Sequence, residues 1–403
     1  MRIKAPSKTA IIYFIILIAI FRPAYVPFSW LNWIYRGIQA TSLLYLLITT
    51  SSRRLKNSKL ILLSAAYYFV ILLSTIINDG NIEEVINQVL TLLLVILWMH
   101  NMSEKRPHSC VNQLMVVFSI LIFANLVSVI LFPTGLYRSA DAVVSVRYGW
   151  LLGHQSLFSM YSAPAICVSA LFWDNHRTIK SAVYALSVIG ACVVQTAILG
   201  SANNIISIII IVAGVGVMYL FRMKKFNFTM VYIAVAALVL IISVFQAVGF
   251  MEPIVTKYLH RSMTFTQRTF IWAKTIDQIT NHWLLGVGIQ PDDVVYAQIG
   301  AAHAHNQYLQ CLYIGGIFAF IIFLFILFRS FESLQNNANS LAGRVMISAV
   351  IALMIQMIFE VYFHHTMGRV LIVLSFYFEK LCLSTNQPQK VKRKRLRWKL
   401  LKV

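Results

Sequence analysis

Two histidines stand with one residue between them in the run from His303 to Gln307, where a polar segment meets an apolar one. Histidine changes its protonation state near neutral pH, so either imidazole could take a proton from a reacting hydroxyl group. A histidine at a helix N-terminus can also be structural, with its ring hydrogen-bonded to the backbone. For a lone histidine the structural role is the favoured interpretation, so a proton-transfer site at His305 depends on the motif around it. On a continued helix His303 would point elsewhere, so we expect it to have a supporting role.

A helical periodicity precedes the histidines and includes an arginine. Apolar residues follow Arg268 at helical spacing, on one face: Trp272, Ile276, Ile279 and Trp283. The pattern predicts an amphipathic helix on the outer membrane surface, which ends near Asn281 to Trp283, where Gly286 and Gly288 let the chain turn. Packing explains the apolar residues of this face. An arginine on the same face instead indicates an anionic partner, either a carboxylate or a phosphate.

A second polar segment, residues 133–156, is rich in arginine and aromatic residues. Its candidate residues are Arg138, Arg147, Tyr148, Trp150 and His154. They could provide an anion contact and aromatic rings that stack on sugar faces. An ordinary outer loop with interfacial aromatic residues is an equally good interpretation.

Glu360 lies deep in an apolar run, just before His364 and His365. A carboxylate is costly to bury in a membrane, so this residue is expected to be paired or functional. Pairing with Arg369 or with a loop arginine is the simpler interpretation, and a role as a base is the alternative.

Membrane helices must position these groups, because 59% hydrophobic residues, 12% charged residues and a mean hydropathy of +0.75 exclude a soluble globular protein. Twelve apolar runs predict an all-α polytopic membrane protein with about 12 transmembrane helices. They span residues 10–28, 31–50, 60–77, 86–101, 110–132, 157–173, 182–199, 205–221, 229–250, 306–328, 345–362 and 369–384. A large extracytoplasmic loop, residues 251–305, separates the ninth and tenth runs. The first run follows basic residues, and we interpret it as an uncleaved helix.

The charges predict the orientation. With both termini in the cytoplasm, 25 of the 34 basic residues fall in inside segments, as the positive-inside rule requires. We therefore expect a single membrane domain over residues 1–384 and a basic cytoplasmic tail over 385–403. The positive charge indicates contact with anionic lipids and not with nucleic acid. The five cysteines are scattered without metal-ligand spacing, so no metal and no cofactor are expected.

Three motifs carry a resemblance to a known family. They are the run from Gln267 to Trp272, the run from Asn281 to Gly288, and the run from His303 to Leu309 ahead of the pair Gly315 and Gly316. Together they resemble the superfamily of O-antigen ligases and O-antigen polymerases (Wzy-type) over residues 261–320. The resemblance implies a glycosyltransferase of the bacterial inner (cytoplasmic) membrane. Such an enzyme transfers a glycan from an undecaprenyl diphosphate carrier to an acceptor hydroxyl on the outer side.

The resemblance also implies roles for particular residues. Arg268 would hold the diphosphate and His305 would activate the acceptor. Contacts with the donor or acceptor are expected from Arg138, Arg147, Tyr148, His154, Arg261, Trp272, His303, Asn306 and Glu360. The implied partners are the carrier-linked oligosaccharide, the acceptor glycan, anionic lipids and a chain-length regulator protein.

The chain departs from the family pattern at one place. Many relatives carry an arginine after a serine at the outer end of a middle helix, whereas this chain reads Leu199 to Asn204 there without a basic residue. Arg147, Arg261 or Arg138 could supply the charge, or the donor is held differently.

Three functions fit these observations. The favoured one is a polymerase that joins lipid-linked polysaccharide repeat units. A ligase that moves a finished glycan to the lipid A core needs the same groups, and the missing arginine argues mildly against it. A transporter or flippase of lipid-linked oligosaccharides is the alternative of another class, but its charged groups would lie near the membrane midplane.

Overall fold

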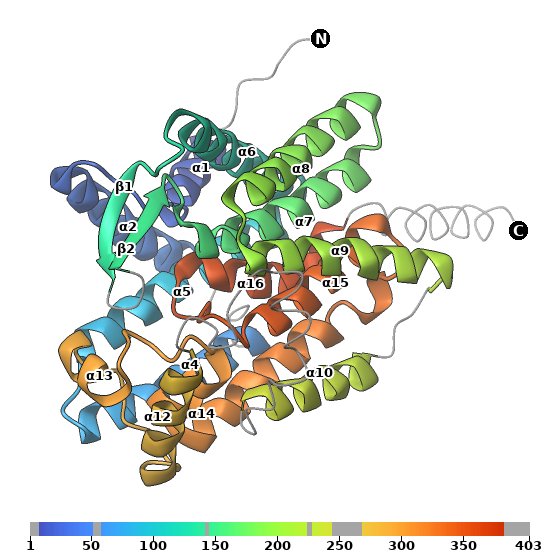
Figure 1. Cartoon of the computed structure of the whole chain (residues 1–403). Coiled ribbons are helices and arrows are strands. Elements are labelled where there is room, and N and C mark those ends of the chain that lie inside the picture. The colour runs from blue at the N-terminus through green and yellow to red at the C-terminus, as the bar shows by residue number, and fades with distance from the viewer. Residues whose placement is uncertain (1–7, 51–57, 142–144, 224–227, 244–267, 383–403) are drawn as a thin grey trace, which may run out of the picture.

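The computed structural model describes residues 8–50, 58–141, 145–223, 228–243 and 268–382, and there the chain is almost entirely helical (Figure 1). The helices are α1 (Lys8–Ile20), α2 (Ser29–Thr49), α4 (Lys59–Ile77), α5 (Ile82–Lys105), α6 (Pro107–Leu131), α7 (Ser159–His176), α8 (Ile179–Leu199), α9 (Ala202–Leu220), α10 (Phe228–Ser243), α12 (Arg268–Asn281), α13 (Asp292–Ile299), α14 (Gln307–Glu332), α15 (Leu341–Gln356) and α16 (Thr366–Leu381). Each of the twelve predicted apolar runs overlaps one of these helices. The two others, α12 and α13, lie in the long loop between α10 and α14.

Seven segments of the described chain are long and apolar enough to cross a membrane. They are Lys59–Ile77, Ile82–Lys105, Pro107–Leu131, Gln155–His176, Ile179–Leu199, Ala202–Leu220 and Gln307–Asn337. Lys8–Ile20, Thr229–Leu238 and Leu341–Gln356 are shorter apolar helices. The helical content and these spans agree with a polytopic membrane protein, while the count of twelve crossings and the cytoplasmic position of the termini stay predictions.

Loops that are predicted to lie on one side of the membrane contact one another. The backbone N–H of Asn81, in the turn between α4 and α5, donates to the carbonyl of Ile289 in the long loop. Asn175, at the end of α7, donates its side-chain amide to the carbonyl of Leu381 at the end of α16. Each contact joins two loops assigned to the same side, as an alternating arrangement of helices requires.

A small antiparallel sheet is the departure from an all-α fold. The strands β1 (Tyr137–Asp141), β2 (Ser145–Trp150) and β3 (Gly153–His154) pair in the order β1-β2-β3. They occupy the predicted outer loop between α6 and α7, and Figure 1 shows the hairpin beside α1 and α2. Tyr137 of β1 stacks on Tyr25, which follows α1, so the hairpin is packed against the helices.

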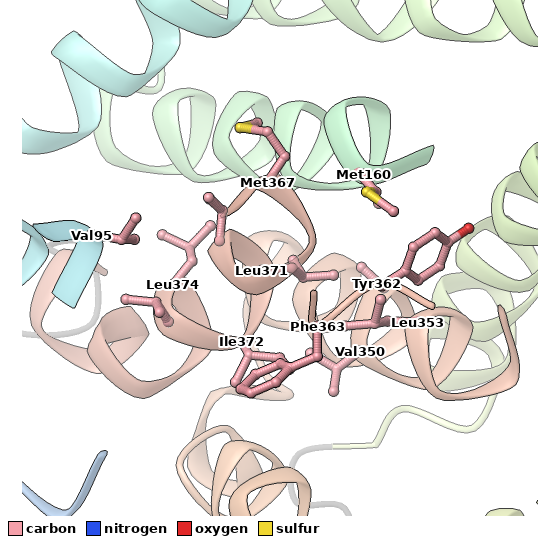
Figure 2. Packing of buried hydrophobic residues seen from close by; sticks show 14 of the residues in the cluster. Val95, Met160, Val350, Leu353, Tyr362, Phe363, Met367, Leu371, Ile372 and Leu374 are labelled. Atoms are coloured by element: carbon pink, nitrogen blue, oxygen red, sulfur yellow. The ribbon is translucent and has the colours of Figure 1, made fainter. Parts of the chain in front are cut away.

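Most side chains of α16 and of the segment 357–365 before it are buried. Figure 2 shows Tyr362 and Phe363 of this segment among buried residues of α7, α15 and α16, such as Met160 and Leu353. Helices in a membrane associate through van der Waals packing and hydrogen bonds, because lipid tails are themselves apolar. The segment 357–365 is therefore positioned by buried contacts.

Two glycine motifs that are distant in the sequence pack against each other. The turn that follows α12 donates the N–H of Val287 to the carbonyl of Tyr313, at 2.7 Å, and α14 donates the N–H of Ile317 to the carbonyl of Trp283, at 2.9 Å. At this point α14 is kinked at Gly316, whose φ is 60°. A Cβ atom at Gly316 would collide with the backbone of Leu284, so glycine is required for the close approach.

Candidate functional site

Side chains from three parts of the chain meet at Glu360. Its Oε1 atom lies 3.2 Å from Nδ1 of His305 and 3.9 Å from Nε2 of His303. Its Oε2 atom lies 3.7 Å from a guanidinium nitrogen of Arg268. Glu360 is buried, with 4% of its surface exposed. Four of the residues predicted from sequence therefore form one cluster, called here the Glu360 cluster.

The start of α14 places the two histidines. Asn306 caps the helix, because its side-chain oxygen accepts the backbone N–H groups of Tyr308 and Leu309. His303 and His305 therefore precede the helix, and His305 has the left-handed φ of 47°. Their rings lie 4.1 Å apart. The expectation that His303 points away from His305 was wrong, because it assumed that the helix continues through both residues.

Helix α12 places Arg268 and supports the histidine loop. Arg268 is its first residue, and one turn later the fully buried Trp272 donates its indole N–H to the carbonyl of Ala304 at 3.0 Å. The predicted amphipathic helix is present, and its position on the outer surface stays a prediction. Trp283 was wrongly placed on its buried face: it is 60% exposed, because the helix ends at Asn281.

The segment 357–365 carries Glu360 beyond the end of α15, so this carboxylate does not lie within a helix as the apolar run suggested. The side-chain oxygen of Gln307 accepts the N–H groups of Tyr362 and Phe363 at 3.0 and 2.7 Å. Arg369 was considered as a partner of Glu360. It instead donates to the carbonyl of Phe363 and, through its other nitrogens, to two further carbonyls. The Glu360 carboxylate pairs with Arg268, which lies in the predicted long loop. Gln307 and Arg369 both hold the backbone of the segment 357–365 through hydrogen bonds.

The charges of the cluster favour an ionised carboxylate. Burial would raise the pKa of Glu360, but the hydrogen bond from His305 and the nearby cationic groups lower it below its usual value. For His303, burial is the main cause that lowers the pKa, and the neighbouring His305 adds to it. The cluster therefore combines an anion, a fixed cation at Arg268 and a histidine that favours its neutral form.

The same atoms raise the question of a metal. One ligand atom each from His303, His305 and Glu360 lie within 4.8 Å of one another, which is a donor set that binds zinc and similar ions. However, Arg268 faces the second carboxylate oxygen, and its permanent charge would repel a cation held by the same group. We therefore interpret the cluster as a hydrogen-bonded network for proton transfer.

Residues 190–324 match the family described as O-antigen ligase. This segment is therefore similar to members of that family. The match confirms the resemblance predicted from the motifs, and it includes α12 and His305 of the Glu360 cluster. Members of the family are membrane enzymes of the glycosyltransferase type, ligases and polymerases. A comparison with curated proteins found no match.

Glu360 lies outside the segment that matches the O-antigen ligase family, so the family motifs alone could not place it beside His305. Its position follows from the contact between the first residues of α14 and the segment 357–365. The backbone N–H of Gln307 donates to the carbonyl of Met357 at 2.8 Å. The sequence signal was the cost of burying a lone carboxylate, which pointed to a partner without identifying it.

The candidates of the first outer loop lie in the β-hairpin. The guanidinium group of Arg138 lies over the ring of Tyr148, 5.3 Å from its centre, and both side chains are exposed. His154 caps the short helix after β3 through Nδ1. The structure does not describe the side chain of Arg147, and Arg261 lies outside the described residues. Which residue replaces the arginine that is missing from the stretch Leu199 to Asn204 therefore stays a prediction.

Sequence reasoning missed a polar contact between the middle helices and the Glu360 segment. The hydroxyl of Tyr362 lies 2.7 Å from the hydroxyl of Ser159 and accepts the side-chain amide of Asn203 at 2.6 Å. Asn203 belongs to the stretch where O-antigen ligase relatives carry the arginine. The stretch therefore contacts Tyr362, which follows Glu360 by two residues in the sequence. In this chain the stretch contributes an amide at this contact instead of a cation.

Proposed function

We propose that the protein is a polymerase of polysaccharide repeat units. It transfers a glycan from an undecaprenyl diphosphate carrier to a sugar hydroxyl of the acceptor, on the outer side of the bacterial inner membrane. The observation that carries the proposal is the Glu360 cluster, which brings one proton acceptor and one permanent cation to the same place.

His305 accepts the proton of the acceptor hydroxyl. Its Nδ1 atom faces Glu360, and a carboxylate accepts the Nδ1–H hydrogen bond, which leaves the lone pair on Nε2. Nε2 removes the proton while the hydroxyl oxygen forms a bond to the anomeric carbon of the donor. Glu360 stabilises the imidazolium that results. General base catalysis of this kind contributes roughly 10²–10⁴-fold to a rate.

Arg268 stabilises the leaving group. The bond between the anomeric carbon and the diphosphate oxygen breaks, and its electron pair stays with the diphosphate, which remains on the lipid. A guanidinium group has five N–H donors in a planar fork, and this fork fits phosphate oxygens. The proton held by His305 then passes to water, so the reaction needs no cofactor.

A ligase is the second candidate, and the description of the matched family favours it. It uses the same proton transfer and the same leaving group, but its acceptor is the lipid A core or another glycan. A transporter of lipid-linked oligosaccharides remains the alternative of a different class, and it would form no bond.

Reconstitution of the full-length protein with a carrier-linked repeat unit tests the proposal, with gel analysis of the products. A ladder of products is expected. A single transfer to an added acceptor would identify a ligase, and the absence of any new glycosidic bond would contradict an enzymatic role. Arg268→Ala should abolish the ladder while the protein stays in the membrane. Lys274→Ala, on the same helix but outside the cluster, is the matched control.

A further inference from the structure

A polar cavity of about 440 Å³ lies beside the Glu360 cluster. One wall is formed by Asn81 and Glu84 at the start of α5, and another by the stretch from Gly288 to Asp292. Residues of α14, including Gln310, also line the cavity. Sites for small molecules have volumes of about 300–1,000 Å³, so this cavity has room for a sugar unit.

Two further lining residues belong to the segments that carry His305 and Glu360. Ala302, which lines the cavity, immediately precedes His303, and His364 lines it four residues after Glu360. Gln310 joins the two regions directly, because its side-chain oxygen accepts the backbone N–H of Ala304 at 2.9 Å. A ligand in the cavity would therefore lie next to the loop that holds His305.

The chemistry of the lining suits a polyol and not a diphosphate. Carboxylates, amides, an imidazole and a phenol face the cavity, and no lysine or arginine is among the described residues that line it. Carboxylates accept hydrogen bonds from sugar hydroxyls and repel phosphate. The carboxylate of Asp292 has no hydrogen-bond or ion-pair partner within the described part of the chain, so it is available to a ligand.

We infer that this cavity binds the acceptor sugar whose hydroxyl is deprotonated at His305, while the diphosphate of the donor lies on the side of Arg268. The inference rests on the proposed function. It assigns the two substrates to opposite sides of the Glu360 cluster according to charge: the cationic side takes the anionic donor, and the acidic cavity takes a neutral or cationic glycan.

The test uses the full-length protein and the repeat-unit oligosaccharide released from its carrier by mild acid. The single variant Asp292→Ala should raise the KM for this acceptor at least about tenfold, as expected for lost hydrogen bonds to a charged group. The double variant, which combines Asp292→Ala with Glu84→Gln, should also raise this KM at least about tenfold. The KM for the donor should change less than about twofold on the same scale. Asp277→Ala, an acidic residue of α12 outside the cavity, is the control and should change neither value.

Unchanged acceptor KM in both cavity variants, with transfer intact, would overturn the inference and leave the proposed function standing. If the wild-type protein forms no glycosidic bond, the proposed function fails, and direct binding of the oligosaccharide decides about the cavity. If the wild type binds the oligosaccharide and both variants bind it more weakly, the cavity is supported as a sugar site. If the wild type does not bind the oligosaccharide, the inference is overturned. Displacement of the oligosaccharide by inorganic pyrophosphate would also overturn it, because the cavity would then hold the donor.

Discussion

At the scale of single residues, the site depends on backbone conformations that local sequence patterns do not reveal. The residue types of Arg268, His303, His305 and Glu360 could be selected from the sequence, because charged and titratable groups are few in so apolar a chain. Their convergence could not be predicted, because it needs the left-handed backbone at His305 and a contact between segments more than 50 residues apart.

Removal of divalent metals should leave glycan transfer unchanged. The positive charge of Arg268 at the second oxygen of Glu360 disfavours a metal at the three ligand atoms, and the proposed proton transfer needs none. The rate is measured before and after extensive treatment with a chelator. A loss of activity that added zinc or manganese restores would make the cluster a metal centre.

The stability of the folded protein should fall as the pH decreases from about 7.5 to about 5.5. Burial lowers the pKa of His303 in the folded state, whereas a histidine in the unfolded chain has a pKa of about 6.5. The unfolded state therefore binds more protons in this window, and acid favours it. Glu360 does not add to this fall, because an unfolded glutamate titrates near about 4.3, below the window.

Thermal unfolding in detergent at the two ends of this pH window checks the assignment to His303. The fall in the midpoint should be smaller in His303→Gln than in the wild type, since glutamine does not titrate. Equal falls in both proteins would show that other groups cause the pH dependence.

At the scale of elements, the local patterns predicted the helices well and the hairpin poorly. Helix α12 was predicted because its buried face repeats within a few turns, and Trp272 lies on that face. The strands β1 and β2 are 5 and 6 residues long and carry interfacial aromatic residues, so they resembled an ordinary outer loop. The contacts of the hairpin also come from distant residues, such as the stacking of Tyr25, between α1 and α2, on Tyr137.

Gly316→Ala should strongly destabilise the protein and reduce transfer. The new Cβ atom would collide with the Leu284 backbone, and alanine would be strained at a φ of 60°. A strained backbone position of this kind costs about 1–3 kcal/mol before the collision is counted. The displaced turn would also disturb α12 and Arg268.

Gly190→Ala is the matched control for this change, because Gly190 lies within α8 and a Cβ there meets no atom within 4 Å. Alanine in a helix interior is favoured over glycine by roughly 0.5–1 kcal/mol. The thermal midpoint of this variant should therefore equal or exceed that of the wild type. A Gly316→Ala protein as stable as the wild type would show that the glycine contact is dispensable.

At the scale of the whole molecule, composition predicted a polytopic membrane protein and the helices agree with it. Hydropathy depends on each segment alone, and a helix overlaps each of the twelve predicted apolar runs. The number of helices that cross the membrane also depends on neighbouring helices and on the lipid. Helix α15 has 16 residues and is shorter than the candidate spans, so its length alone does not decide whether it crosses. The charges predict which end faces the cytoplasm, and by the same prediction the site lies on the outer side.

Cysteine labelling tests this orientation. The five native cysteines are buried, so the background should be low. A membrane-impermeant maleimide added to cells with a permeable outer membrane should label Thr280→Cys, on an exposed position of α12. It should label Arg177→Cys, in an exposed turn after α7, only once the inner membrane is opened. The reverse pattern would place the Glu360 cluster in the cytoplasm and contradict the proposed donor.

The most direct test of the account is the initial rate of glycan transfer by His305→Ala in reconstituted membranes. If His305 removes the proton of the acceptor, the rate should fall by roughly 10²–10⁴-fold relative to the wild type. The exposed His282, replaced by alanine, serves as the control and should retain the wild-type rate. A near-normal rate in His305→Ala would remove His305 from the mechanism and contradict the assignment of the Glu360 cluster as the catalytic centre.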